Sequence, residues 1–185
     1  MAKPAKDTYV ALLRGINVGG NNMLRMKDLA ALCGDCGCAD VRTYIQSGNV
    51  VFACKPAAAD KLAAQLSTRI AGDFGLKVPV ILRSAAALAR VAEANPFLAA
   101  GQDVERQYVM FLADAPAKAA VAALDPQRSP PDEFAVVGGE IFLHLPNGAG
   151  RSKLTSAYFD SKLKTISTAR NWRTLLTLIE MTRAT

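Results

Sequence analysis

Two short apolar segments constrain the fold most, because neither shows the alternation expected of a strand with one exposed face. Residues 9–13 read Tyr-Val-Ala-Leu-Leu, and residues 49–53 read Asn-Val-Val-Phe-Ala. Unbroken apolar runs of this length are typical of strands that are buried on both faces. We therefore expect both segments to be central strands of a sheet that is covered on both sides.

The first half of the chain predicts strands and helices in the order β-α-β-β-α-β. A helix is expected over 26–33, a strand over 41–45, a helix from Pro56 to Gly72 or Phe74, and a strand over 77–83. Pro79 cannot donate to a ladder, so the last strand should lie at an edge. This order is the ferredoxin-like arrangement, in which the first and third strands are central.

The second half partly repeats the pattern. We expect strands over 108–112, 134–137 and 141–145 and helices over 86–94, 117–124, 152–164 and 170–182. Hydrophobic residues make up 51% of the chain and charged residues 21%, a globular composition. The predicted fold is α+β, with two packed ferredoxin-like subdomains of the β-α-β-β-α-β type, the second incomplete. Residues 1–84 form the first subdomain, 85–99 a connecting helix and loop, and 100–185 the second, with two C-terminal helices.

Nothing in the sequence predicts a membrane protein. The apolar runs are well short of the roughly 18 residues that a membrane helix needs. Residues 1–7 are polar and lead directly into the first strand, unlike a secretory signal peptide. We therefore expect a cytoplasmic protein.

The basic charge is concentrated near the end of the chain. The 185 residues contain 22 Lys and Arg against 16 Asp and Glu, a net charge of +6. From position 151 onward there are seven basic and two acidic residues, the basic ones being Arg151, Lys153, Lys162, Lys164, Arg170, Arg173 and Arg183. This asymmetry favours an anionic partner, namely phosphate, a nucleotide or nucleic acid. The alternative explanation is that helices need charged residues on their solvent-facing sides anyway.

Two glycine-rich loops could bind an anion. Gly15–Asn22 follows Arg14, and Pro146–Lys153 leads into a predicted helix. Glycines allow the backbone to approach a ligand closely, and free N–H groups at helix starts attract anions. Neither loop matches the P-loop or the dinucleotide fingerprint. Turns and helix caps are the alternative explanation.

Two further segments are unusually polar for their expected positions. Strand alternation places Arg42, Tyr44 and Gln46 on one face, before a bend at Gly48. Residues 168–173 contain two arginines and the tryptophan at the start of an expected helix. Arginine suits planar, bidentate recognition of phosphate or carboxylate. Pairing of these arginines with acidic residues is the alternative.

Metal, redox and acid–base sites receive little support. The four cysteines are Cys33, Cys36, Cys38 and Cys54, and the chain has one histidine, His144, far from them in sequence. A zinc site would need a second pair of ligands, and a redox motif should open a helix rather than end one. We expect reduced bystander thiols and no metal. No residue stands out as a catalytic acid, base or nucleophile.

Several segments together resemble a known family. Residues 9–22, 41–52, 95–97 and 168–174 are similar to the bacterial family called domain of unknown function 1697, over about residues 8 to 180. The resemblance implies two α+β subdomains and no established activity. Its signature positions fall here on Arg14, Gly15, Asn17, Gly19, Gly20, Arg42, Thr43, Ser47, Gly48, Asn49, Arg170 and Asn171. Their polar character, without Asp, Glu, His or Cys, favours binding over proton transfer.

We therefore predict a small anionic ligand, a nucleotide or phosphorylated metabolite, in a pocket between the two halves. Arg14 and Arg42 would contact the anion, the loop backbone would cradle it, and Asn17 and Asn49 would orient it. The full set of predicted ligand-binding residues is Arg14, Gly15, Asn17, Gly19, Gly20, Arg42, Thr43, Ser47, Asn49, Arg170 and Asn171. Alternatives are nucleic-acid binding by the basic C-terminal helices, an enzyme of phosphoryl or nucleotidyl chemistry, and a purely structural role. An RNA-recognition motif is disfavoured, because its base-stacking aromatics would be buried here.

Overall fold

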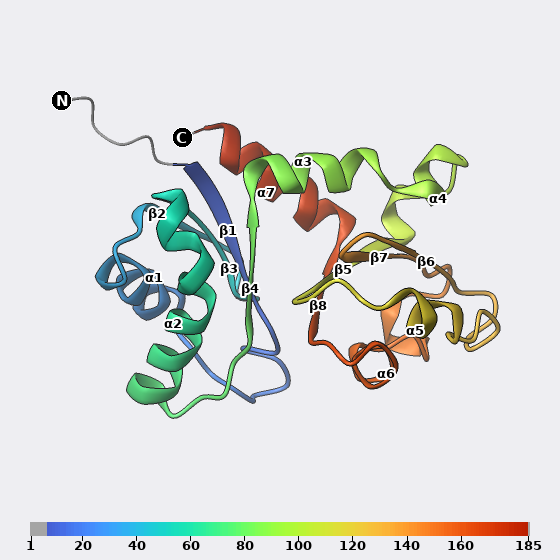
Figure 1. Cartoon of the computed structure of the whole chain (residues 1–185), viewed down its shortest axis with the longest axis horizontal. Coiled ribbons are helices and arrows are strands. Elements are labelled where there is room, and N and C mark those ends of the chain that lie inside the picture. Colours follow the sequence, from blue (N-terminus) through green and yellow to red (C-terminus); the bar gives the residue numbers. More distant parts are fainter. Residues whose placement is uncertain (1–6, 185) are drawn as a thin grey trace. The chain divides into compact units, whose positions relative to one another are not determined.

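The computed structural model describes residues 7–184, which form two compact units (Figure 1). Unit 1 runs to Ala89 and also includes the chain from Thr177 onward, whereas unit 2 is Arg90–Leu176. Each unit contains one four-stranded antiparallel sheet with helices, so the α+β prediction is confirmed.

The elements of unit 1 alternate as the sequence predicts. In chain order they are β1 (Asp7–Leu13), α1 (Met26–Asp35), β2 (Ala39–Tyr44), β3 (Asn49–Cys54), α2 (Pro56–Phe74), β4 (Val80–Ser84) and the start of α3 (Ala85–Glu93). The strand order is β2-β3-β1-β4, so β1 and β3 are central and β4 lies at an edge, as expected from Pro79. That proline stands directly before β4 and its carbonyl accepts the N–H of Arg14.

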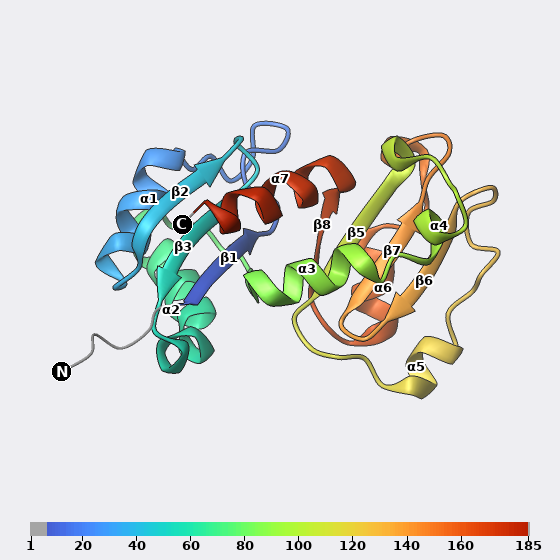
Figure 2. The ribbon, with the colours of Figure 1, turned by 90° about the horizontal axis from the view of Figure 1, so that it is seen from above.

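Both faces of the first sheet are buried. On one face Leu13 and Phe52 pack with residues such as Leu29 of α1 and Leu66 of α2, which cover this side (Figure 1). On the other face Val10 and the side chains beside it are fully buried. The C-terminal end of α7 (Trp172–Arg183) lies over β2 and β3 on that face (Figure 2). The unbroken apolar runs are thus explained by cover on two sides.

Unit 2 contains the second sheet. Its elements are α4 (Pro96–Ala99), a 3-10 turn η1 (Val104–Arg106), β5 (Gln107–Leu112), α5 (Lys118–Ala122), β6 (Glu133–Val137), β7 (Glu140–His144), a 3-10 turn η2 (Ala149–Arg151), α6 (Ser156–Leu163) and β8 (Ser167–Asn171). Unit 2 also includes the C-terminal end of α3 and the first residues of α7. The strand order is β6-β7-β5-β8, and Leu112, Leu143 and Phe159 lie in the core on the side of α5 and α6.

The prediction that the second half is incomplete is wrong. Residues 167–171 form β8, which pairs antiparallel with β5, so the order β-α-β-β-α-β is complete in unit 2. The expected helix over 170–182 begins only at Trp172, because Arg170 and Asn171 still belong to the ladder. The expected helix over 152–164 begins at Ser156, where the Thr155 hydroxyl accepts the N–H of Tyr158 as a cap.

None of the helices within residues 7–184 combines the length and the apolar character that crossing a membrane requires.

Candidate functional site

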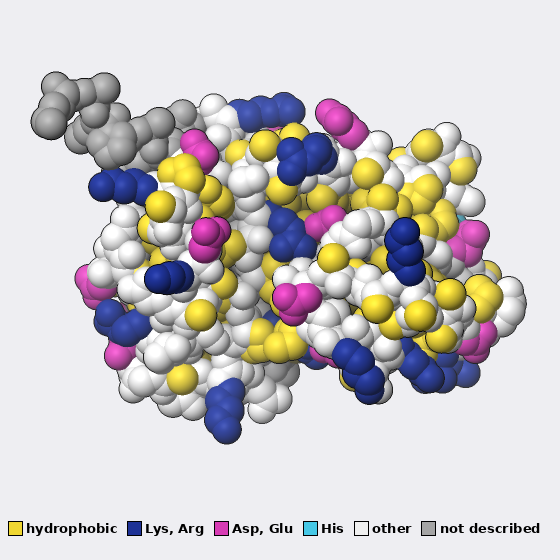
Figure 3. All heavy atoms as spheres, in the orientation of Figure 1, with side chains coloured by type: hydrophobic (Ala, Val, Ile, Leu, Met, Phe, Trp, Pro, Cys, Tyr) yellow, Lys and Arg dark blue, Asp and Glu magenta, His cyan; other side chains and the backbone are white. Residues whose placement is uncertain are grey.

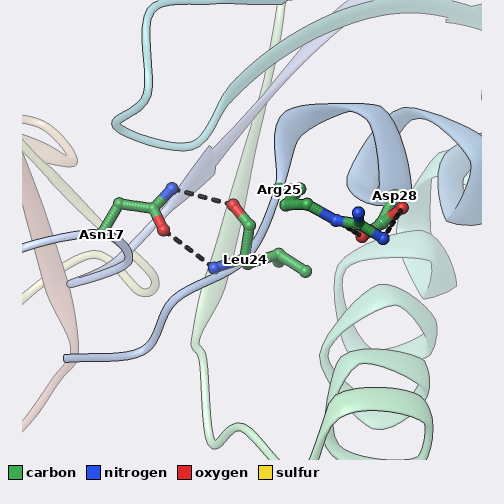
Figure 4. A network of polar contacts seen from close by, with 4 residues as sticks. All are labelled: Asn17, Leu24, Arg25 and Asp28. Atoms are coloured by element: carbon green, nitrogen blue, oxygen red, sulfur yellow. Dashed lines mark hydrogen bonds and ion pairs between the residues drawn. The ribbon is translucent and has the colours of Figure 1, made fainter. Parts of the chain in front are cut away.

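The glycine loop between β1 and α1 is organised by one side chain. The Oδ1 of Asn17 accepts the N–H of Leu24 at 2.8 Å, and its Nδ2 donates to the Leu24 carbonyl at 2.9 Å (Figure 4). The Nδ2 of Asn22 donates to the carbonyl of Gly15 at 3.0 Å. These bonds fold the loop back on itself, and its far end is fixed where Arg25 pairs with Asp28 of α1 at 2.7 Å.

The loop backbone is held in conformations that favour glycine and asparagine. Gly15, Gly19 and Gly20 have φ values of 65°, 57° and 79°, and Asn17 has 54°. Val18 and Asn21 bridge the two sides of the loop, so the two adjacent glycines form its tip. Apart from each glycine and its two chain neighbours, no atom of residues 7–184 lies within 4 Å of a Cβ built on any of the three glycines. Their sequence positions are thus set by backbone conformation, and the loop surface there is open.

The turn between β2 and β3 is equally constrained. The Nδ2 of Asn49, which is fully buried, donates to the carbonyl of Tyr44 and to the hydroxyl of Ser47. At Gly48 a Cβ would lie 2.6 Å from the Cβ of Leu13, so only glycine fits. Ile45 has a φ of 47° and is half exposed, a strained conformation for a β-branched residue.

Loop and turn are joined directly. The Nδ2 of Asn17 also donates to the carbonyl of Gln46 at 2.8 Å, and the N–H of Leu13 donates to the carbonyl of Gly48. We call this end of the first sheet, comprising residues 14–25 and 45–49, the loop–turn junction. It brings together seven of the predicted site residues: Arg14, Gly15, Asn17, Gly19, Gly20, Ser47 and Asn49. The sequence pattern singled out the side chain of Gln46 but not its carbonyl, and it gave no sign of Leu24, because backbone groups leave no side-chain pattern.

Arg42 and Thr43 lie on β2, away from the turn. The Nη2 of Arg42 donates to the carbonyl of Met181 at 2.7 Å, near the C-terminal end of α7. A cation at this position complements the exposed carbonyls of a helix end. Thr43 pairs with Val50, so it faces the opposite side of the sheet, toward α1 and α2. Arg42 also lines a surface cavity with Asp40, Val41 and Ala184.

Arg170 and Asn171 belong to unit 2, on β8. Arg170 is 7% exposed and donates to the Thr168 hydroxyl and the Ala169 carbonyl, and burial lowers the pKa of its guanidinium to about 10. The Oδ1 of Asn171 accepts the N–H of Thr174 at 2.8 Å, which caps the start of α7.

The basic C-terminal residues are not equivalent. Arg170 is buried, and the exposed Arg173 pairs with Glu105. The other five are also exposed, on η2, α6 and α7, in the loop after η2 and at the residue that follows α6. On the face shown in Figure 3, basic and acidic side chains are interspersed. The basic side chains of residues 151–185 are therefore distributed over several elements of the structure.

The four cysteines are free thiols of unit 1: Cys33 and Cys54 are buried in its core, and Cys36 and Cys38 are partly buried and pack against it. Burial raises the pKa of Cys33 and of Cys38 to about 12, so both remain protonated at neutral pH. Within residues 7–184, no group of three or more His, Cys, Asp or Glu side chains is placed to hold a metal ion.

The segments that form the loop–turn junction also carry the family resemblance. The family model described as protein of unknown function, DUF1697, matches residues 7–142. The chain belongs to this family. Ten of the DUF1697 signature positions named above lie inside the matched range, and Arg170 and Asn171 lie beyond it. The match is thus shorter at its C-terminal end than the resemblance suggested.

Among solved structures, the chain is similar to a conserved bacterial protein of Streptococcus pneumoniae, SP0830. The two are 24% identical, the alignment covers 96% of this chain and 99% of the other, and the TM-score is 0.73. This likeness establishes a shared fold for the DUF1697 chain described here. A search of curated proteins finds no match.

Proposed function

We propose that unit 1 binds a small anionic ligand, a nucleotide or phosphorylated metabolite, at the loop–turn junction. The observation that carries the proposal is the direct bond between Asn17 and Gln46, which places the two glycine motifs at one end of the sheet. Arg14, Arg25 and Lys27 stand in or beside this junction, against one acid, Asp28, which pairs with Arg25. The local charge therefore favours an anion.

The roles of the residues differ from those that the sequence suggested. The side-chain amides of Asn17 and Asn49 are bonded to the loop and turn, so in this proposal both shape the site. Arg42 is engaged with the end of α7. In this proposal the anion is contacted by the positive charge of Arg14, which directly precedes the loop, and by the open backbone of Gly19 and Gly20. The part of the prediction that adds Arg170 and Asn171 in a pocket between the halves stays a prediction.

The strand orders support one further inference about architecture. Each unit has the order β-α-β-β-α-β, with its first and third strands central, and we infer that each is a ferredoxin-like domain. The domain boundaries 1–84, 85–99 and 100–185 and the cytoplasmic location stay predictions. So do the alternatives of nucleic-acid binding and of phosphoryl or nucleotidyl chemistry.

The proposal is tested by thermal shift with adenosine triphosphate, adenosine monophosphate, ribose 5-phosphate and inorganic phosphate. A ligand at a hundred times its Kd should add about 2.7 kcal/mol, which raises the Tm of a chain this size by roughly 5–10 °C. Arg14→Ala should lose this shift, whereas Arg151→Ala, which removes an exposed arginine of unit 2, should keep it. The proposal would be refuted if none of the four compounds raised the Tm, or if the compound that raised it had the same effect on the Arg14→Ala variant as on the parent.

A further inference from the structure

A cavity opens on the surface of unit 2 where the loop after α5 meets the edge strand β6. Its volume is about 280 Å³, near the lower end of the range of small-molecule sites, which is about 300–1,000 Å³. It is lined by residues 126–127 and 130–134. Four of these, Pro126, Pro130, Pro131 and Phe134, are apolar, so the cavity has room for a small ligand with an apolar part.

The loop that forms the cavity is held by one serine. The hydroxyl of Ser129 donates to Asp132 Oδ2 at 2.7 Å and accepts the N–H of Lys153 at 3.0 Å. The N–H of Asp132 donates back to the carbonyl of Ser129 at 2.7 Å. On β6, the ring of Phe134 packs edge-on against that of Phe159 of α6, with the centroids 5.4 Å apart. Hydrogen bonds and core packing therefore hold these lining residues in place.

The carboxylate of Asp132, which lines the cavity, is only half satisfied. Asp132 is 8% exposed, and its Oδ2 accepts the Ser129 hydroxyl, whereas its Oδ1 accepts no hydrogen bond from residues 7–184. Oδ1 is not sealed in the interior, since the fully buried side-chain atoms without a partner in this range belong to Asn95 and Gln107. Buried charges in proteins are normally paired, so this oxygen is suited to a cation from outside.

Within the described part of the chain, no cation pairs with Asp132. The one basic residue of the loop, Arg128, lies over the ring of Tyr158, with its Cζ 4.8 Å from the ring centroid. Glu133, whose Oε1 contacts His144 Nδ1 at 3.3 Å, adds a second negative charge beside the cavity. Among the described residues the lining thus has two acids and no base, in a chain whose net charge is +6.

We propose that this cavity binds a guanidinium group on an alkyl stem, as in arginine. A guanidinium is planar and weakly hydrated, so it enters apolar surroundings more easily than an ammonium and stacks on aromatic rings. It donates to Asp132 Oδ1, while the prolines and Phe134 contact the stem and the planar face. A metal ion fits less well, because no group of three or more His, Cys, Asp or Glu side chains within residues 7–184 could hold one. The site belongs to unit 2 and does not depend on the function proposed for unit 1.

Isothermal titration calorimetry of the full chain tests this proposal. Nα-acetyl-L-arginine amide is the probe, since the guanidinium is its only charged group. Nα-acetyl-L-citrulline amide has nearly the same shape without the charge, and Nα-acetyl-L-lysine amide carries an ammonium instead. Asp132→Asn removes the negative charge but retains an oxygen for the Ser129 hydroxyl. Asp114→Asn, which removes an exposed carboxylate of the same unit outside the lining, is the matched control.

We expect the arginine compound to bind saturably, the citrulline compound to bind at least tenfold more weakly, and the lysine compound to bind more weakly as well. Asp132→Asn should weaken binding of the arginine compound at least tenfold, and Asp114→Asn should not change it. The proposal would be overturned by an arginine compound that does not bind saturably, by a citrulline or lysine compound that binds as tightly, or by parent-like affinity of a folded Asp132→Asn variant. The citrulline comparison uses the parent chain, so it decides even if Asp132→Asn does not fold.

Free L-arginine distinguishes the two sources of such a group. If it binds more tightly than the blocked compound, the ligand is a free metabolite whose ammonium or carboxylate is also contacted. If it binds equally or more weakly, the ligand is an arginine side chain of a peptide, whose neighbouring peptide bonds the blocked compound imitates.

Discussion

The side chain of Asn17 and the carbonyl of Gln46 form a 2.8 Å hydrogen bond between segments that are 29 residues apart. Asn17 also holds both backbone groups of Leu24, so one amide closes the glycine loop and ties it to the turn. An asparagine in the left-handed region is needed here for its backbone as well as for its side chain. The loop–turn junction is therefore held in one conformation by hydrogen bonds within unit 1.

Asn17→Ala should destabilise unit 1 by about 2–4 kcal/mol, because three hydrogen bonds are lost and alanine disfavours a positive φ. Asn17→Gly loses the same bonds but tolerates the backbone, so it should be about 1 kcal/mol less harmful. Urea unfolding of the two variants measures both quantities. Equal stability of Asn17→Ala and the parent would show that these bonds contribute nothing.

Gly48→Ala should be among the most harmful single substitutions in the turn. Its Cβ would meet the Cβ of Leu13 at 2.6 Å and the side chain of Ile16 at 2.9 Å, at a φ of 74°. We expect a loss of about 3–5 kcal/mol, or failure to fold. Gly20→Ala is the matched control, since its φ is 79° but its surroundings are open, and it should cost about 1 kcal/mol. Similar melting curves for the two variants would contradict the close packing.

Arg42→Ala should loosen the end of α7 over the first sheet. The guanidinium bonds the carbonyl of Met181, and loss of such a charge-assisted bond costs about 1.5–3 kcal/mol. Hydrogen exchange of the last turn of α7 should become faster, while exchange in β7 of unit 2 stays unchanged. Lys61→Ala, on the exposed side of α2, is the control. Unchanged exchange in α7 would assign Arg42 to another role.

The stability of unit 1 should fall as the pH rises from about 9 to about 12. Burial raises the pKa of Cys33 and of Cys38 from 9.0 to about 12. Between these values the unfolded chain has released the protons that the folded chain keeps, so stability is full below pH 9 and declines above it. The variant Cys33→Ala/Cys38→Ala should show a shallower decline in urea unfolding under reducing conditions. A decline as steep as that of the parent would contradict this.

Local patterns predicted most of unit 1 because its elements have strong signals of their own. Pro56 begins α2, Gly75 ends it in a left-handed conformation, and Pro79 precedes an edge strand. In unit 2, β8 was missed because its five residues are polar or small and stand directly before a helix. Pairing with β5 decides that segment, and such a partner lies far away in sequence.

For the candidate site, too, the sequence indicated the backbone conformation better than the contacts of the side chains. The glycine and asparagine positions indicated where the backbone turns, because these residues adopt positive φ most readily. The side chains were harder to interpret, since an amide that binds a ligand and one that binds a distant carbonyl look alike in sequence. Asn17, Asn49 and Arg42 are bonded within the fold.

The sequence by itself determined the α+β class, the central strands and the places where the backbone must turn. These depend on short-range periodicity and on the conformational limits of single residues. The tertiary structure decided which polar groups meet: Asn17 with Gln46, Arg42 with Met181, and Glu133 with His144. Those contacts depend on strand pairing between distant segments. A shift of the pairing by one residue would move every side chain of a strand to the other face of the sheet.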